Sequence, residues 1–311
     1  GDEIEDLNEI TNPLTPELDA YYGINPDAQD FACALRQGIT TSCLIPGSAN
    51  VICGWGIVLK SAGQDRLLKH PAVMKGAMGI NPKGCYVGKG MPPMTRMAIA
   101  NTMKTWLRNV REYMDKKAAA GDDQSKLPPF DLGLEHGIPV LNKEIPLKVH
   151  SYMHDMMTLL EIAREFDILI TIDHALGASD FADELTDQHV SGVIFGPTSE
   201  PLFPGEGGKL DYECCKMLDD RGVNIAVMTD GPVSVFNMLL YEMGEAVRHG
   251  MDPVRALGMT TINAAKILGV DDRVGSLAQG KDADFLLWSR LRTSATDAEL
   301  RGVYIDGIKV L

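Results

Sequence analysis

Apolar, strand-like runs alternate with helical segments along most of this chain, and this alternation limits the fold more than any other feature. In the second half of the chain the alternation becomes short and regular. Such a pattern is typical of parallel strands that are joined by crossover helices. We therefore predict an α/β fold, with strands near 39–45, 73–77, 145–150, 167–174, 193–195 and 223–230 and helices at 95–117, 153–166, 180–186, 212–221, 235–249 and 253–268.

Composition excludes several classes of protein. With 311 residues, of which 45% are hydrophobic, the chain can bury a large core, and the length suits one barrel with an appendage. The net charge of -14 argues against a nucleic-acid surface, because phosphate binding uses clustered Lys and Arg. No apolar run is long enough to cross a bilayer, and the acidic start is unlike a signal peptide. We expect neither nucleic acid nor a membrane as a partner.

The cysteines indicate the compartment. Their spacing shows no paired framework, and two of them are direct neighbours on a predicted helix. Unpaired cysteines are typical of reducing compartments, so we expect a cytoplasmic protein. The six cysteines stand at positions 33, 43, 53, 85, 214 and 215.

Polar residues end three of the predicted strands. His150 ends the first of these runs, His174 ends the second and Asp230 ends the third. In a parallel barrel the carboxyl ends of all strands meet on one face, so these residues would share one pocket. Two histidines and an aspartate are suitable ligands for a divalent metal. We predict a metal site, with zinc as the first expectation and iron or manganese as alternatives.

The segment that ends the last long helix carries the most specific motif. Thr261–Gly269 reads as the end of a helix, Gly280-Lys281-Asp282 as a turn, and Ala283–Trp288 as an apolar strand. This order of elements resembles the amidohydrolase superfamily. The residues of the segment are most similar to the branch of imidazolonepropionases and Xaa-Pro dipeptidases. The resemblance implies a (β/α)8 TIM-type barrel over residues 1–269 and part of a small β-sandwich domain over residues 270–311.

The chain departs from the family at its beginning. In that family the first barrel strand ends in a His-x-His pair that supplies two metal ligands, and none of the seven histidines here forms such a pair. We therefore expect the first strand to be missing, because the chain is a fragment, a separate polypeptide carries the strand, or the protein is a shortened relative. A seven-stranded barrel would leave an unpaired edge. We expect that association with the missing N-terminal segment, or with another copy, covers it.

The resemblance assigns roles to the strand-end residues. It implies that His150 and His174 match the histidines of the fifth and sixth barrel strands, and that Asp230 matches the last-strand aspartate that touches the metal and moves a proton. Lys75 matches a lysine that many relatives carboxylate to bridge two metals. The alternatives are a hydrogen-bonded core histidine at either position, a helix N-cap for Asp230, and a lysine paired to an acid at Lys75.

Substrate contacts are expected from the loops at the same face. The segment Pro46–Gly56 follows a predicted strand, and its glycines permit close approach, so we predict that Asn50 and Trp55 bind substrate. His154 is a weaker candidate at the start of a helix, and the loop 196–208 is similarly placed. Lys148 is two residues before His150 and so faces the same side of its strand.

Together these features predict a metal-dependent hydrolase for a carbon-nitrogen bond in a small molecule, such as a cyclic amide or a peptide-like substrate. Asp230 would serve as general acid and base, with His174 beside the carbonyl. One alternative is a catalytically silent relative that serves as a scaffold or partner-binding subunit. Another is a barrel lyase or aldolase with a Schiff base on Lys75 or Lys148, although the tail from Gly275 to Asp284 argues against it.

Overall fold

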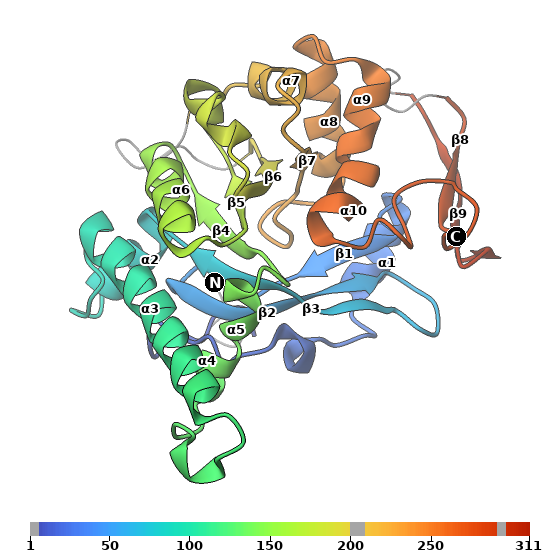
Figure 1. Ribbon diagram of the computed structural model, residues 1–311. Coiled ribbons are helices and arrows are strands. Elements are labelled where there is room, and N and C mark those ends of the chain that lie inside the picture. The colour runs from blue at the N-terminus through green and yellow to red at the C-terminus, as the bar shows by residue number, and fades with distance from the viewer. Residues whose placement is uncertain (1–5, 200–208, 291–296) are drawn as a thin grey trace.

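A computed structural model describes residues 6–199, 209–290 and 297–311. Its centre is one curled seven-stranded sheet in which every strand lies beside its neighbour in the chain, and a separate three-stranded sheet follows (Figure 1). The mixed α/β class is therefore confirmed. The strands of the large sheet are β1 (Thr41–Leu44), β2 (Ile52–Lys60), β3 (Leu67–Ala77), β4 (Leu147–Ser151), β5 (Ile170–His174), β6 (Val190–Phe195) and β7 (Ile225–Val227).

The strands from β3 to β7 are all parallel, as the alternation of strands and helices predicts. Helices or helical turns connect each of these strands to the next, which is the connection that parallel neighbours require. The helices are α1 (Gln29–Arg36), α2 (Ile80–Val87), α3 (Arg96–Ala120), α4 (Leu132–Glu135), α5 (Ile138–Leu141), α6 (His154–Phe166), α7 (Glu213–Asp220), α8 (Met238–Arg248), α9 (Pro253–Met259) and α10 (Ile262–Leu268).

The first part of the sheet corrects the prediction of an all-parallel barrel. β1 pairs antiparallel with β2, and β2 pairs antiparallel with β3. The cause is the length of the connections, because residues 45–51 and 61–66 are too few to hold a crossover helix. The predicted loop Pro46–Gly56 is also partly wrong, since its second half from Ile52 belongs to β2 and is mostly buried in the sheet.

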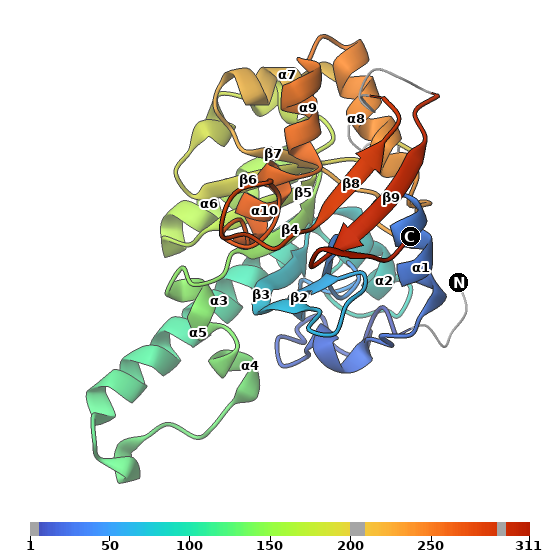
Figure 2. The same ribbon diagram turned by 90° about the vertical axis from the view of Figure 1, so that its right-hand side faces the viewer.

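Apolar side chains on the outer face of the sheet form the main core. Val149 and Ile172 belong to it, together with residues of α3 and α6. Helix α3 begins where the Thr95 side chain accepts a hydrogen bond from the Ala98 N–H group, a standard N-cap. Its buried residues recur at helical spacing along one side, which fixes that side against the sheet. The far end of α3 and the loop after it project from the body of the molecule (Figure 2).

Two predicted helices have a different form. The segment 253–268 is two helices, α9 and α10, with a break at Thr260–Thr261. Asp252 caps α9 and Pro253 is its first residue, as predicted. After the break, the Asn263 side chain donates to the Ile225 carbonyl of β7, so tertiary contacts with the sheet set the direction of α10. The predicted helix at 180–186 is two short 3-10 helices, at Ala178–Phe181 and Glu184–Thr186.

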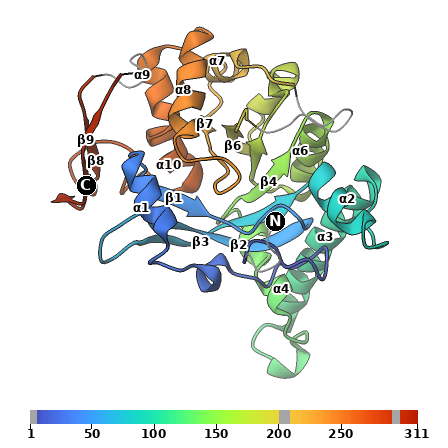
Figure 3. The same ribbon diagram turned by 180° about the vertical axis from the view of Figure 1, so that it is seen from behind.

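The C-terminal part forms an antiparallel sheet in the order β10-β9-β8. The strands are β8 (Phe285–Trp288), β9 (Leu300–Ile305) and β10 (Ile308–Lys309), and the last two form the predicted hairpin around Asp306-Gly307. Seen from behind, this sheet lies on the side of the molecule that bears α1 and β1 (Figure 3). In the described ranges, no helix has the length and hydropathy that a membrane span requires.

Candidate functional site

The carboxyl ends of β3, β4 and β5 bring three of the predicted site residues to one place. The register pairs Lys75 with Lys148 and Ala77 with His150, and it pairs Ser151 with His174. Paired residues of parallel strands share a face, so Lys75, Lys148 and His150 point to the inner face of the curled sheet. All three side chains are buried.

Backbone conformation brings the second histidine to the same face. Strict alternation along β5 would direct Asp173 inward and His174 outward. The strand ends at His174, which has a left-handed φ of 69°, and Ala175 follows with a φ of 54°. The imidazole rings of His150 and His174 then lie 4.0 Å apart between centroids, inclined by 62°. Two consecutive left-handed residues are costly for side chains other than Gly, and such conformations concentrate at functional sites.

His150 is in the state that a metal ligand needs. Burial lowers the pKa of His150 well below its usual value, and the neighbouring His174 and Lys75 lower it further. Neutral imidazole is the form that coordinates metals. Within the described ranges, neither ring nitrogen of His150 has a hydrogen-bond partner, although both are buried. Buried polar atoms without a partner are rare and call for an explanation such as an ion.

Two lysines and one aspartate lie on the same inner face. The Lys148 ammonium contacts Asp173 Oδ1 at 2.6 Å, and Lys75 Nζ lies 3.8 Å from Asp173 Oδ2. Lys75 Nζ also donates to the Gly76 carbonyl at 3.1 Å. The side chains of Lys75 and Asp173 are each only 2% exposed. Both lysines thus share the carboxylate of Asp173. The predicted pairing of Lys75 with an acid is present, but at 3.8 Å it is longer than the 2.6 Å contact of Lys148.

Asp230 stands apart from the histidine pair in the chain topology. It follows β7, which lies two strands beyond β5, and it is half-buried with a left-handed φ of 52°. The helix N-cap alternative is wrong, because the next helix, α8, begins only at Met238. Among the described residues, no three His, Cys, Asp or Glu side chains gather closely enough to bind one metal. The structure therefore joins His150 to His174, and the metal role of Asp230 stays a prediction.

The predicted substrate contacts have other partners in the structure. Asn50 is 3% exposed; its amide donates to the Glu9 carbonyl and to Thr15, and its oxygen accepts from the Tyr86 hydroxyl. These bonds fit a structural role for Asn50. The Trp55 ring stacks on His136 at 3.5 Å between centroids, and its indole N–H donates to the His136 carbonyl.

His154 is exposed and is the first residue of α6. Its ring lies edge-to-face with the Phe181 ring, with the two centroids 5.6 Å apart. The predicted loop 196–208 lies outside the described residues from position 200 onward. Its beginning is held by Glu242 of α8, whose Oε1 accepts from the Thr198 N–H group and hydroxyl at 2.7 Å and 2.8 Å. Burial raises the pKa of Glu242, and the two bonds from Thr198 oppose that shift.

Among the buried acids that the sequence did not single out are Asp173 and Glu242. Asp173 directly precedes His174, and this adjacency was the available signal for a polar strand end. Glu242 gave no such signal, because it lies within an ordinary amphipathic helix.

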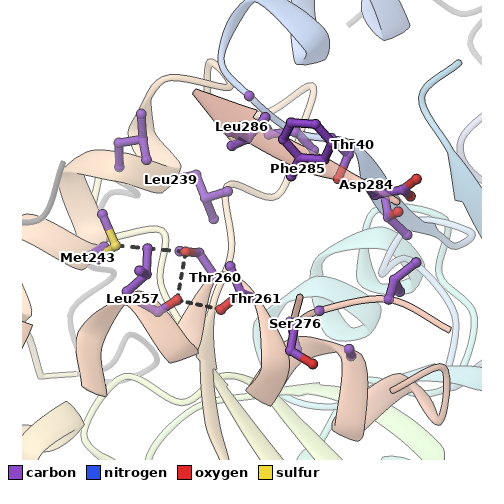
Figure 4. Close-up of a pocket in the computed structure, with 18 of the residues that line it drawn as sticks. Thr40, Leu239, Met243, Leu257, Thr260, Thr261, Ser276, Asp284, Phe285 and Leu286 are labelled. Carbon is purple, nitrogen blue, oxygen red and sulfur yellow. Dashed lines mark hydrogen bonds between the residues drawn. The ribbon is translucent and has the colours of Figure 1, made fainter. Parts of the chain in front are cut away.

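A separate apolar cavity of about 530 Å³ lies at another part of the molecule. Its walls come from α8, α10, β8 and the residues that lead into β1 (Figure 4). Leu239, Met243 and Leu286 contribute apolar surface, and Thr41 contributes a hydroxyl that has no hydrogen-bond partner within the described residues. None of the predicted metal ligands lines this cavity.

Comparison with solved structures decides the family. The crystal structure of an amidohydrolase from Thermotoga maritima has 35% sequence identity to this chain and a TM-score of 0.92, and the match covers 98% of this chain and 80% of that one. The chain belongs to the amidohydrolase family. The family model for amidohydrolases also matches residues 212–310, which include the motif at Gly280-Lys281-Asp282.

Curated amidohydrolase relatives show the same likeness at lower coverage. Amidohydrolase tasK of Hapsidospora irregularis is 25% identical over 97% of this chain and 33% of its own length. Imidazolonepropionase of Thermoplasma acidophilum is 23% identical over 82% of this chain and 59% of its own length. A 5-methylthioadenosine/S-adenosylhomocysteine deaminase of Thermoanaerobacter pseudethanolicus is 30% identical over 51% of this chain and 38% of its own length. The chain thus spans between about a third and three fifths of these relatives.

Proposed function

We propose that this amidohydrolase family member hydrolyses a carbon-nitrogen bond in a small molecule with the help of a divalent metal. The observation that carries the proposal is the contact of two buried imidazoles, His150 and His174, at the carboxyl ends of neighbouring strands. This end of a parallel barrel is where active sites are built. Family membership and the names of the relatives, which include imidazolonepropionase and a deaminase, support this reaction class.

The residues on this face fit a metal. His150 offers two buried nitrogens without partners in the described ranges, and His174 lies against it. We propose that these two imidazoles hold the ion, with zinc as the first candidate and iron or manganese as alternatives, and that Asp230 and a carboxylated Lys75 are further ligands. A bound ion of this kind lowers the pKa of water toward neutrality.

The protein's own groups would then move the proton and orient the substrate. Asp230 is half-buried in the segment that follows β7. We propose that it accepts a proton from the attacking water and delivers it to the leaving nitrogen. His174 would lie beside the substrate carbonyl. A cyclic amide or a peptide-like molecule is the substrate class that the likeness to imidazolonepropionases favours.

The test combines metal analysis with turnover. The purified protein should contain zinc, iron or manganese, and it should hydrolyse at least one member of a panel of cyclic amides and dipeptides. Asp230→Asn should reduce hydrolysis by roughly 10²–10⁴-fold, the range for loss of a general acid or base, while the metal content and the circular dichroism stay unchanged. A protein that binds no metal would instead favour the silent scaffold, and near-normal turnover of the variant would remove the proton role of Asp230.

We also propose that the sheet belongs to a (β/α)8 barrel over residues 1–269 that a further strand completes, with residues 270–311 as part of a β-sandwich domain. β1 and β7 are the two edge strands of the large sheet, and β8 is an edge of the small one. Unpaired edges are normally covered. We propose that the covering segment comes from the same polypeptide or from another copy. Slow hydrogen exchange at the free edge of β1 would support this closure. The six free cysteines fit a reducing compartment such as the cytoplasm.

A further inference from the structure

One buried ion pair links the two strands that carry the histidines. Lys148 of β4 donates to Asp173 Oδ1 of β5 at 2.6 Å, and the two side chains are 7% and 2% exposed. Lys148 is two residues before His150, and Asp173 is directly before His174. The pair therefore spans the gap between the strands immediately below both imidazoles.

The local geometry makes this ion pair a direct side-chain link between β4 and β5. Register places Lys148 beside Thr171 and His150 beside Asp173, so the lysine stem must extend along the strands to reach its partner. Both strand ends are followed by unusual backbone, because Met153 and His174 have left-handed φ values of 46° and 69°. The regular ladder between β4 and β5 reaches the Ser151–His174 pair, and beyond it the Met153 N–H group donates to the Leu176 carbonyl. The ion pair adds a side-chain connection between β4 and β5 within the last residue pairs of this ladder.

We propose that Lys148 and Asp173 are positioning residues that hold His150 and His174 at the separation needed to share one metal ion. This inference rests on the proposed metal site and adds two residues to it. Neither residue needs to touch the ion. The pair acts by fixing the strand ends, and Asp173 in addition lies 3.8 Å from Lys75, so one carboxylate connects three neighbouring strands. Partners that orient metal ligands commonly change affinity by 10–100-fold when they are removed.

A purely structural ion pair is the competing explanation. Breaking a buried pair by removing one partner destabilises a protein whatever lies nearby. That explanation predicts a lower melting temperature with an unchanged metal affinity. A positioning role predicts a change in the affinity itself and in the geometry around the ion. The two are therefore separated by measuring metal binding on folded protein.

The experiment measures zinc affinity by competition with a chromophoric chelator, and it records the visible spectrum of the cobalt-substituted protein. Lys148→Met should raise the zinc dissociation constant by about 10–100-fold and alter the cobalt spectrum. Lys148→Arg keeps a cation that can bond Asp173, so it should stay near the wild type. The matched control is Lys143→Met, which removes an equally short pair, Lys143–Asp167 at 2.6 Å, from an exposed site and should change nothing.

A double variant tests whether the two residues act as one unit. Lys148→Met with Asp173→Asn should bind zinc no more weakly than the weaker single variant, because partners in one interaction are not additive. If Lys148→Met does not fold, Asp173→Asn alone carries the same expectation of 10–100-fold weaker binding. Unchanged zinc affinity and cobalt spectra in the folded variants would overturn the inference while leaving the metal site intact. Absence of zinc binding by the wild type would overturn both.

Discussion

Two buried lysine clusters lie at opposite ends of the same sheet, and they differ in how their charge is balanced. At the end of β2, the fully buried Lys60 contacts Asp282 at 2.7 Å, Asp284 at 3.1 Å and Asp306 at 2.6 Å. At the other end, Lys75 and Lys148 share the single carboxylate of Asp173 among the described residues. The first cluster places three carboxylates around Lys60, with Arg273 also bound to Asp282, whereas the second places two cations around one carboxylate.

The difference distinguishes a structural contact from the candidate metal site. The three aspartates of the Lys60 cluster come from the motif around Gly280-Lys281-Asp282 and from the β9–β10 turn, so Lys60 fastens the small sheet to the large one. The lysines near His150 are less fully paired, and His150 itself has two buried nitrogens without partners in the described ranges. Incompletely satisfied buried groups near a strand end are candidates for binding and catalysis. The family motif in the tail thus marks a structural contact, and the candidate site lies elsewhere.

The largest expected effect is at the structural end. Lys60→Met removes the fully buried cation and leaves the buried carboxylate of Asp284 beside two partly exposed ones, so the free energy of unfolding should fall by about 3–5 kcal/mol. Urea denaturation followed by circular dichroism measures this. Lys281→Met is the control, because the Lys281 ammonium bonds the Ser276 hydroxyl at the surface of the same turn and lies outside the Lys60 cluster. A loss as small as that of the control would show that Lys60 does not hold the two sheets together.

Little change in the free energy of unfolding is expected for the lysine cluster near His150. Lys75→Met leaves the neutral pair Lys148–Asp173 intact and replaces a poorly paired charge with an apolar chain. Asp173 keeps its closer partner Lys148, so the substitution leaves no buried charge uncompensated. The unfolding free energy of the metal-free protein should therefore change by no more than about 1 kcal/mol, while bound metal measured by elemental analysis decreases. A loss as large as that of Lys60→Met would erase the distinction between the clusters.

Acid titration gives a smaller and more specific difference. Burial alone would raise the pKa of Asp282, but hydrogen bonds from Lys60 and Arg273 outweigh it and hold the pKa below the usual 3.8. A carboxyl with a depressed pKa in the folded state stabilises the protein above the unfolded value, and this stabilisation is lost as the pH falls through the folded pKa. Asp282→Asn should thus flatten the fall in melting temperature below about pH 4 and lower the melting temperature at pH 7. An unchanged acid profile would contradict the pairing.

Much of the candidate site could be predicted because the ends of the buried strands can be recognised in the sequence. His150, His174 and Lys75 stand at the ends of apolar runs, and parallel strands bring such ends together. The contact of Asp173 was not predictable from the sequence. It depends on the side chain of the neighbouring strand β4 that reaches its carboxylate, which is Lys148.

The antiparallel part of the sheet shows why other elements were missed. Gly54 and Gly56 suggested a loop, but they lie within β2. A Cβ at Gly54 would lie 2.5 Å from the Leu18 carbonyl oxygen, and one at Gly56 would lie 2.5 Å from an Ile45 methyl group. These glycines are needed for close packing inside a strand, and a single sequence does not distinguish that use from a flexible turn.

The most direct test of the account is an anomalous-difference map from crystals grown with zinc, recorded on both sides of the zinc edge. We expect a peak within bonding distance of a ring nitrogen of His150 and a ring nitrogen of His174. Zinc bound only at other residues, or a fully occupied crystal soak that leaves this pair without a peak, would contradict the central claim that these two imidazoles hold the metal.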